Sequence, residues 1–187
     1  MTLGYGDLRK GLSVELDGEP YAVVDYERSK MQQRAPVMRI RFKSFKTGRV
    51  VDRSFNGYDV KLTPASVERK SAQYIYNDGG FYYFMDTVTF DQFPIAEDQV
   101  QDVLSYMVEQ TVVDAIFYED SPIAIELPIA VDLEVADAVP WLKGDTAQGG
   151  TKPVTLETGL KVQVPLFVEV GEMIKVDTRT GEYLSRV

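Results

Sequence analysis

The sequence predicts an all-β protein made of three small β units. Most of the 187 residues fall into short runs that are apolar or that alternate between apolar and polar side chains, as strands do. Turn-forming residues separate these runs, as at Asp17-Gly18, Asn77 to Gly80 and Arg179 to Glu182. Only the stretch from Glu97 to Met107 has the spacing of an amphipathic helix, which favours an all-β class with one short helix.

The first unit is predicted to be a β-barrel of residues 1–64. Asp17-Gly18 joins its first two strands in a tight hairpin, and Lys46 to Arg49 turns the third strand into the fourth. Leu62-Thr63-Pro64 interrupts the pattern, so we place a domain boundary near Pro64. The predicted strands are Leu12 to Leu16, Tyr21 to Glu27, Met38 to Lys43 and Val50-Val51.

The second unit, residues 65–127, is rich in aromatic residues. Its predicted strands are Gln73 to Tyr76, Phe81 to Asp86, Thr111 to Tyr118 and Ile123 to Leu127. The predicted helix near Glu97 to Met107 carries apolar residues at the spacing i, i+3, i+4, i+7, namely Val100, Val103, Leu104 and Met107. The aromatic residues suit either a platform that stacks bases or an ordinary barrel core, and the core is the more common use.

The third unit, residues 128–187, begins near Pro128. Its predicted strands are Ile129 to Val135, Lys161 to Val164, Met173 to Val176 and Tyr183-Leu184. Lys143 to Pro153 is predicted to be a glycine-rich loop, and not a phosphate-binding loop, because the Gly-Lys-Ser/Thr order is absent and Pro153 prevents a following helix. The second and third units are similar in length, but they show no convincing sequence repeat.

Composition narrows the possible chemistry. The chain has no cysteine and no histidine, which excludes disulfides, thiol catalysis, zinc-thiolate sites and the commonest general base. Any enzyme would therefore have to use carboxylates, Lys, Tyr or Ser, and we expect no metal and no cofactor. No apolar run approaches the roughly 18 residues of a membrane span, and the first residues lack the form of a signal peptide. These features predict a cytoplasmic protein with no membrane partner.

Charge is divided unevenly along the chain. Residues 1–64 carry 12 basic and 8 acidic side chains, a net of +4, whereas residues 65–187 carry 8 and 21, a net of −13. The segment 28–53 alone holds nine basic residues and one acid, Asp52. This asymmetry predicts that one end of the molecule contacts a polyanion while the rest does not.

The basic segment has the pattern of a strand with two different faces. Successive side chains of a strand point to opposite sides, so Arg39, Arg41 and Lys43 share one face. Met38, Ile40 and Phe42 share the other face. The polar residues Lys30 to Pro36 then form a hairpin tip that projects Gln33 and Arg34. A solvated edge hairpin whose cations block aggregation explains the same pattern.

Three parts of the chain resemble a known family. The residues concerned are Thr151 to Val168 and Gly171 to Tyr183 in the third unit, Leu16 to Val23 in the first, and Tyr82 to Asp86 with Thr89-Phe90 in the second. The pattern in the third unit spans more than 30 positions and is highly specific. Together these stretches closely resemble bacterial elongation factor P, in order and without a large insertion.

The resemblance implies an SH3-like (KOW-type) barrel followed by two OB-fold barrels in an L shape. It implies a monomeric, non-enzymatic translation factor that binds the ribosome between the peptidyl and exit sites. There it promotes peptide-bond formation at consecutive prolines and relieves stalling. Its partners are then the acceptor end of the peptidyl-tRNA and ribosomal RNA.

The resemblance also implies roles for the basic hairpin. We expect phosphate contacts from Arg28, Lys30, Arg39, Arg41 and Lys43, and contacts to the terminal nucleotides from Gln33 and Arg34. Many family members carry a modified Lys within Pro-Gly-Lys-Gly at the tip, and others carry a glycosylated Arg. A gapless register places Gln33 at that position here, so we expect an unmodified tip. A bulge in one limb is the alternative, and it makes Arg34 the apex.

Other function classes remain open. One is an elongation-factor-P-like paralogue with narrower duties. A general OB-fold binder of single-stranded nucleic acid is another, although the net charge of −13 over residues 65–187 disfavours it. A carboxylate-based hydrolase is a third, and no spacing of acids singles out a catalytic pair.

Overall fold

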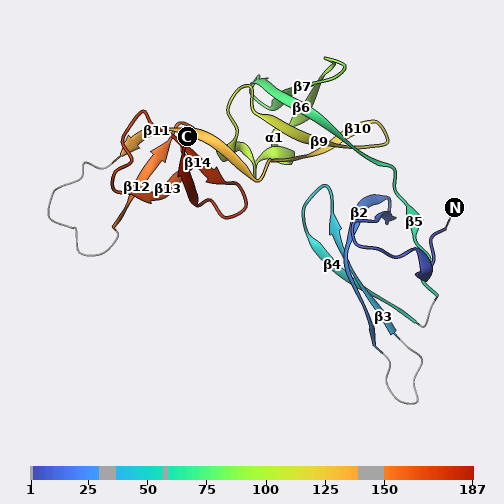
Figure 1. Cartoon of the computed structure of the whole chain (residues 1–187). Helices are drawn as coiled ribbons and strands as arrows, with labels where there is room; N and C mark the ends of the chain where they lie inside the picture. The colour runs from blue at the N-terminus through green and yellow to red at the C-terminus, as the bar shows by residue number, and fades with distance from the viewer. Residues whose placement is uncertain (1, 30–36, 57–58, 139–149) are drawn as a thin grey trace. The chain divides into compact units, whose positions relative to one another are not determined.

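The computed structural model describes residues 2–29, 37–56, 59–138 and 150–187, and their strands form three five-stranded sheets (Figure 1). The helical content of these residues is limited to one α-helical turn and two 3-10 turns. The predicted all-β class is therefore confirmed. Each sheet draws its strands from one continuous part of the chain. The domain boundaries near Pro64 and Pro128 stay predictions.

The first sheet is formed by the first predicted unit, and its strands lie in the order β4-β3-β2-β1-β5. The strands are β1 (Ser13–Leu16), β2 (Glu19–Ser29), β3 (Val37–Ser44), β4 (Val50–Asn56) and β5 (Thr63–Pro64), and a 3-10 turn, η1 (Tyr5–Asp7), precedes them. The predicted Asp17-Gly18 turn is present, with φ of 55° and 81°. Positive φ at both central residues matches the right-handed twist of a two-residue hairpin.

The second and third sheets share one OB-type connectivity. The second consists of β6 (Val67–Asn77), β7 (Phe81–Asp86), β8 (Gln92–Ala96), β9 (Val112–Tyr118) and β10 (Ser121–Glu126). The third consists of β11 (Ala130–Ala138), β12 (Thr151–Leu156), β13 (Lys161–Pro165), β14 (Met173–Asp177) and β15 (Tyr183–Arg186). In both, the first strand is central, with the second and third strands on one side and the fourth and fifth on the other.

The predicted helix is wrong in its extent. Only Glu97–Val100 (α1) is α-helical, and Leu104–Tyr106 (η2) forms a separate 3-10 turn. Val100 is buried, but Leu104 is only half-buried, and the residue before the helix, Ala96, makes no side-chain cap. A segment this short has too little intrinsic stability to stay continuous without a buried face and a cap.

Three strands, β5, β8 and β12, were not predicted, and each contains a proline. β8 includes Pro94, and it lies at the edge of its sheet, where a missing N–H is tolerated. The predicted loop Lys143 to Pro153 is wrong at its end, because Thr151 to Pro153 belong to β12. Among the described residues, pairing of β12 with β11 covers Val154 to Leu156, and Pro153 is paired with β13. Residues 143–149 of that loop lie outside the described residues.

Packing divides the described chain into two compact units. The first unit holds Met1–Lys70 together with Ala115–Ala124. Its barrel core includes the fully buried Val14, Val23, Ile40 and Phe42. The ends of β9 and β10 add a smaller cluster, in which Ile116, Ile123 and Ala124 pack with Phe45 and Val67. There the Tyr118 hydroxyl donates to Glu15 at 3.0 Å.

The second unit holds Ser71–Asp114 together with Ile125–Val187. Tyr74 packs on the buried Phe84, with ring centroids 5.6 Å apart, and Tyr76 stacks on Tyr83. The Tyr74–Phe84 contact fits the core interpretation, whereas Tyr76 is exposed and its stack on Tyr83 is a surface contact. Tyr106 packs against the core of the third barrel, which is formed by β11 to β14 and Val168.

Candidate nucleic-acid interface

The two faces of β3 differ as predicted from its alternating sequence. Met38, Ile40 and Phe42 are at most 1% exposed and form part of the barrel core, whereas Arg39, Arg41 and Lys43 are exposed. The apolar side chains fix the strand, because burying each one stabilises the fold by about 1.5–3 kcal/mol. The three cations are therefore displayed in a row on a rigid strand.

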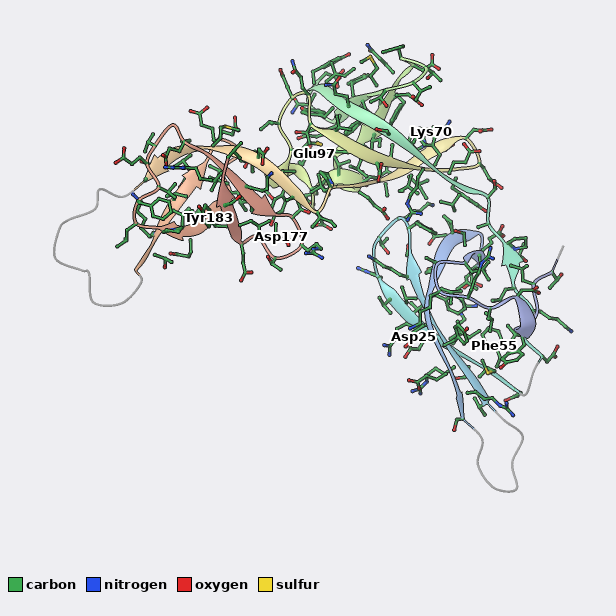
Figure 2. All side chains as sticks on the ribbon, viewed as in Figure 1. Asp25, Phe55, Lys70, Glu97, Asp177 and Tyr183 are labelled. Carbon is green, nitrogen blue, oxygen red and sulfur yellow. The ribbon has the colours of Figure 1, made fainter. Side chains whose placement is uncertain are left out.

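Arg41 lies between carboxylates of the two neighbouring strands and is hydrogen-bonded to one of them. It lies opposite Asp25 of β2 and Asp52 of β4. Its Nε donates to Asp52 Oδ1 at 2.9 Å and its Nη2 to Asp52 Oδ2 at 3.4 Å. This hydrogen bonding lowers the pKa of Asp52 and raises the pKa of Arg41. Asp25, labelled in Figure 2, bonds Lys10 Nζ at 2.9 Å, and that hydrogen bond lowers the pKa of Asp25.

Arg39 and Lys43 have different surroundings from Arg41. Arg39 lies opposite Glu27 and Ser54, and Lys43 lies opposite Ala22 and Val50. Within the described ranges, neither side chain forms an ion pair. Both cations are thus available to an external anion, whereas Arg41 would have to leave Asp52 to bind one.

A shallow cavity of about 200 Å³ opens on this face, between charged side chains of β2, β3 and β4. It is lined by Asp25, Tyr26, Glu27, Arg39, Arg41 and Asp52. Three carboxylates and two guanidinium groups nearly cancel, so the cavity itself has no excess positive charge. An extended polyanion that contacts the exposed cations suits this face better than a small anion enclosed in the cavity.

The other predicted site residues do not all join this face. Arg28 lies opposite Met38, so it belongs to the other side of the sheet. Lys30, Gln33 and Arg34 lie outside the described residues. Two more cations of the segment are paired within the barrel, Lys46 with Glu19 at 3.4 Å and Arg53 with Asp17. The net +8 of residues 28–53 is therefore partly neutralised in the folded barrel.

The sequence analysis missed Asp25 and Glu27 as members of the face. They stand two apart on β2, as Arg39 and Arg41 do on β3, so each acid lies opposite a base. Matching spacings of opposite charge on two strands of a hairpin were the available signal. The register needed to use it includes an irregularity between Val23 and Asp25, which the sequence does not mark.

The described residues contain no group of three or more acidic side chains placed to hold a metal ion. No helix among them is long and apolar enough to cross a membrane. The site residues are thus surface cations on strands of the first barrel, and what they offer chemically is recognition of negative charge.

Comparison with known proteins covers almost the whole chain. Family models match for an elongation factor P KOW-like domain at residues 5–60, an elongation factor P OB domain at 67–125 and an elongation factor P C-terminal domain at 131–186. The protein "Elongation factor P" of Caldanaerobacter subterraneus subsp. tengcongensis is 46% identical over 97% of this chain and 98% of its own length. That of Carboxydothermus hydrogenoformans is 46% identical over 97% of each. Among solved structures, a eukaryotic translation initiation factor 5A from Methanococcus jannaschii is similar with a TM-score of 0.48 and 17% identity, covering 67% of this chain and 95% of that one.

Proposed function

Because this chain belongs to the elongation factor P family, we propose that it promotes peptide-bond formation at consecutive prolines on the ribosome. Membership makes it a translation elongation factor, a class of protein that is generally not an enzyme. The finer proposal is that it binds beside the peptidyl-tRNA, between the peptidyl and exit sites. The observation that carries this proposal is the match of three consecutive family models over the length of the chain.

The physical role proposed for the factor is positioning. Proline is a poor nucleophile in peptide-bond formation, and a protein that orders the end of the peptidyl-tRNA reduces the entropic cost of alignment. Correct alignment contributes as much as about 7–11 kcal/mol in well-oriented reactions, so even a small part of it accelerates a stalled step greatly. The bond-forming chemistry stays with the ribosome.

The outer face of β3 supports a contact to nucleic-acid phosphates. Arg39 and Lys43 are exposed on a rigid strand and form no ion pair with described residues, so a phosphate oxygen has no internal carboxylate to displace there. We propose them as the main contacts, with Arg41 third. Arg28 and Lys30 are proposed to add contacts nearer the tip.

The tip residues complete the proposal. Gln33 and Arg34 are proposed to reach the terminal nucleotides of the tRNA, with both side chains unmodified. Arg34 supplies a planar, permanently charged group with five donors, suited to phosphate or to stacking on a base. Intact mass of the protein from its native source tests this, and an adduct on Arg34 would favour the bulged register with Arg34 at the apex.

A reconstituted translation system depleted of its own factor tests the main function. Added protein is expected to accelerate synthesis on a template with three consecutive prolines and to leave a matched proline-free template unchanged. No gain on the proline template, at saturating factor and with matched ribosomes, contradicts the proposal. A gain restricted to a few proline contexts identifies a paralogue with narrower duties.

The salt dependence of ribosome binding tests the phosphate face. Replacing Arg39 and Lys43 with alanine is expected to weaken binding and to reduce the salt slope by about one for each phosphate that is no longer neutralised. Arg41→Ala is the matched control on the same strand, and a smaller change is expected because its charge is already shared with Asp52. Equal weakening by Lys161→Glu, in the third barrel, contradicts the assignment of the phosphate-binding face to the first barrel.

A further inference from the structure

One turn structure occurs twice in the second compact unit. Residues 86–91 join β7 to β8, and residues 177–182 join β14 to β15; both have the sequence Asp-Thr-x-Thr-x followed by an acid. Each begins with a buried aspartate, 8% exposed at Asp86 and 6% at Asp177. We call these segments turn 86–91 and turn 177–182.

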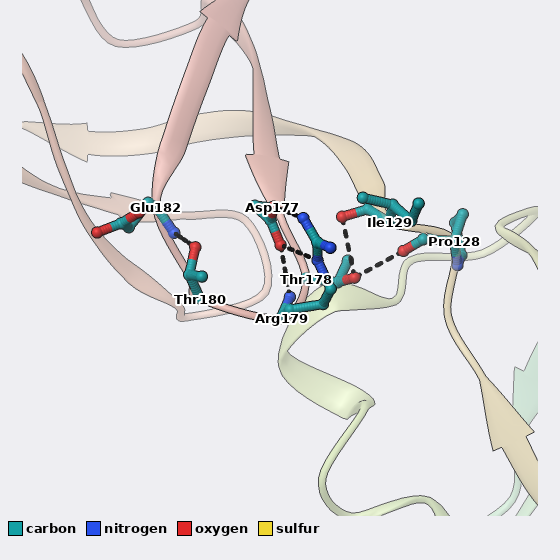
Figure 3. A network of polar contacts seen from close by, with 7 residues as sticks. All are labelled: Pro128, Ile129, Asp177, Thr178, Arg179, Thr180 and Glu182. Carbon is teal, nitrogen blue, oxygen red and sulfur yellow. Dashed lines mark hydrogen bonds and ion pairs between the residues drawn. The ribbon is translucent and has the colours of Figure 1, made fainter. Parts of the chain in front are cut away.

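The two turns are closed by the same hydrogen bonds. The aspartate carboxylate accepts the amide two residues on, at 2.7 Å from Val88 and 2.8 Å from Arg179 (Figure 3). The aspartate carbonyl accepts the amide four residues on, at 3.0 Å from Phe90 and 2.8 Å from Gly181. In each turn the second threonine hydroxyl accepts the amide of the final acid at 3.3 Å.

Each turn is also hydrogen-bonded to the first strand of its sheet or to the residues just before that strand. The Thr87 amide and hydroxyl donate to the Ser71 carbonyl at 3.0 and 3.1 Å. The Thr178 amide and hydroxyl donate to the Ile129 carbonyl at 2.9 and 3.1 Å, and its hydroxyl also reaches the Pro128 carbonyl (Figure 3). Both turns are therefore held by hydrogen bonds within the turn and by hydrogen bonds from their first threonine to the neighbouring backbone.

The two turns differ at their fifth residue, which is Phe90 in one and Gly181 in the other. It has left-handed backbone geometry in both, with φ of 62° at Phe90 and 74° at Gly181. Gly181 has a steric reason, since a Cβ there would lie 3.1 Å from the Tyr106 hydroxyl oxygen. Turn 177–182 is thus packed against η2. Turn 86–91 instead presents Phe90, 67% exposed, and Val88, 80% exposed.

A bulky residue with positive φ is an uncommon and strained choice. An exposed ring brings the isolated chain little packing energy to offset that strain. Contact with another molecule would offset it, because an exposed aromatic side chain on a rigid turn buries apolar area and loses little conformational entropy on docking.

The charge around turn 86–91 decides which kind of partner fits. Residues 71–114 contain eight acidic side chains and no basic one. The nearest basic residues along β6 already lie over aromatic rings, Arg69 over Phe45 and Lys70 over Phe117. A nucleic-acid backbone would be repelled by this surface, whereas an apolar socket on a protein would not.

We propose that Val88 and Phe90 dock into an apolar socket on a protein component of the ribosome. This inference rests on the proposed function, because ribosome binding supplies the partner. The contact adds apolar anchoring by the second barrel to phosphate contacts by the first. The apolar contact should therefore depend little on salt, whereas the phosphate contacts weaken as salt increases.

Photo-crosslinking from position 90 identifies the partner class. The full-length protein with p-benzoylphenylalanine in place of Phe90 is irradiated while bound to proline-stalled ribosomes. The expected adduct is a crosslinked protein whose mass is unchanged by ribonuclease. An adduct to ribosomal RNA, or no adduct from a protein that still binds, overturns the proposal.

Binding measurements supply the second test. Phe90→Gly is expected to weaken ribosome affinity about tenfold with an unchanged salt slope, and Val88→Ser is expected to act in the same direction. Phe90→Tyr keeps the ring and should retain most of the affinity. Suppose that the wild type rescues synthesis at consecutive prolines and that Phe90→Gly binds ribosomes within twofold of the wild-type affinity. This result overturns the inference and leaves the proposed function intact. Failure of the wild type to bind ribosomes overturns the proposed function and the inference together.

Discussion

Turn 86–91 and turn 177–182 share their backbone hydrogen bonds but differ in what surrounds them. Turn 177–182 packs its glycine against Tyr106, whereas turn 86–91 holds Phe90 and Val88 in solvent. The aspartate and the two threonines set the backbone path in both cases. The residues between them follow the surroundings: glycine where a neighbour approaches closely, and an aromatic ring where the space is open.

The third residue adds another difference. Arg179 folds back on Asp177, with Nε at 3.1 Å from Oδ1 and Nη2 at 2.7 Å from Oδ2, while Val88 has no side-chain group to donate. The side-chain and backbone hydrogen bonds from Arg179 lower the pKa of Asp177 to about 2. Turn 177–182 is therefore closed by a charged group that turn 86–91 lacks.

The largest effect is expected from Asp177→Ala. The change removes the acceptor for the Arg179 amide and guanidinium in a nearly buried position, so the melting temperature should fall by on the order of 5 °C or more. Thermal unfolding followed by circular dichroism measures it. Asp86→Ala is the matched control and should cost less, because its turn has no arginine at the third position. A greater loss from Asp86→Ala would show that the arginine adds nothing.

Gly181→Ala is expected to have the next largest effect. A non-glycine residue with left-handed geometry costs roughly 1–2 kcal/mol, and the new Cβ also crowds the Tyr106 hydroxyl. Urea denaturation gives the change in unfolding free energy, provided that the dependence of that free energy on urea concentration is the same in both proteins. Adding Tyr106→Phe should recover only the crowding part of the loss. Full recovery in the double variant would mean that backbone geometry costs nothing at this position.

At low pH the fold should lose the stabilisation that the ionised Asp177 carboxylate provides. Its pKa is lower in the folded state than the ordinary 3.8, so its carboxylate stabilises the fold above that value. This stabilisation is lost as pH falls from about 4 through about 2. The difference in melting temperature between wild type and Asp177→Asn should thus shrink over that range. A difference that stays constant to pH 2 argues against the ion pair as its source.

Sequence reasoning predicted the features that depend on one strand and missed those that depend on how several strands pair. Alternation along β3 placed Arg39, Arg41 and Lys43 on one face, because strand geometry alone determines it. The Arg41–Asp52 ion pair depends on the register of β3 and β4, and the Lys10–Asp25 pair joins β2 to a residue outside the strands, so local patterns did not reveal either pair. The Asp-Thr repeat escaped notice for a related reason. It joins the second and third strands of one sheet and the fourth and fifth of the next, so matching the units in chain order does not align the copies.

The smallest effect on stability is expected from Phe90→Gly, and it should have the opposite sign. Relief of the left-handed geometry contributes roughly 1–2 kcal/mol, while the added freedom of glycine in the unfolded chain removes about 0.5–1 kcal/mol of that gain. The net result is a chain as stable as the wild type or slightly more stable. Phe90→Ala separates the two contributions, since alanine retains the backbone strain and loses only the ring; its unfolding free energy should match that of the wild type. A clear loss of stability in both variants would mean that the ring packs within the barrel. In that case Phe90 would be retained for folding, and the reason to expect an external partner at turn 86–91 would disappear.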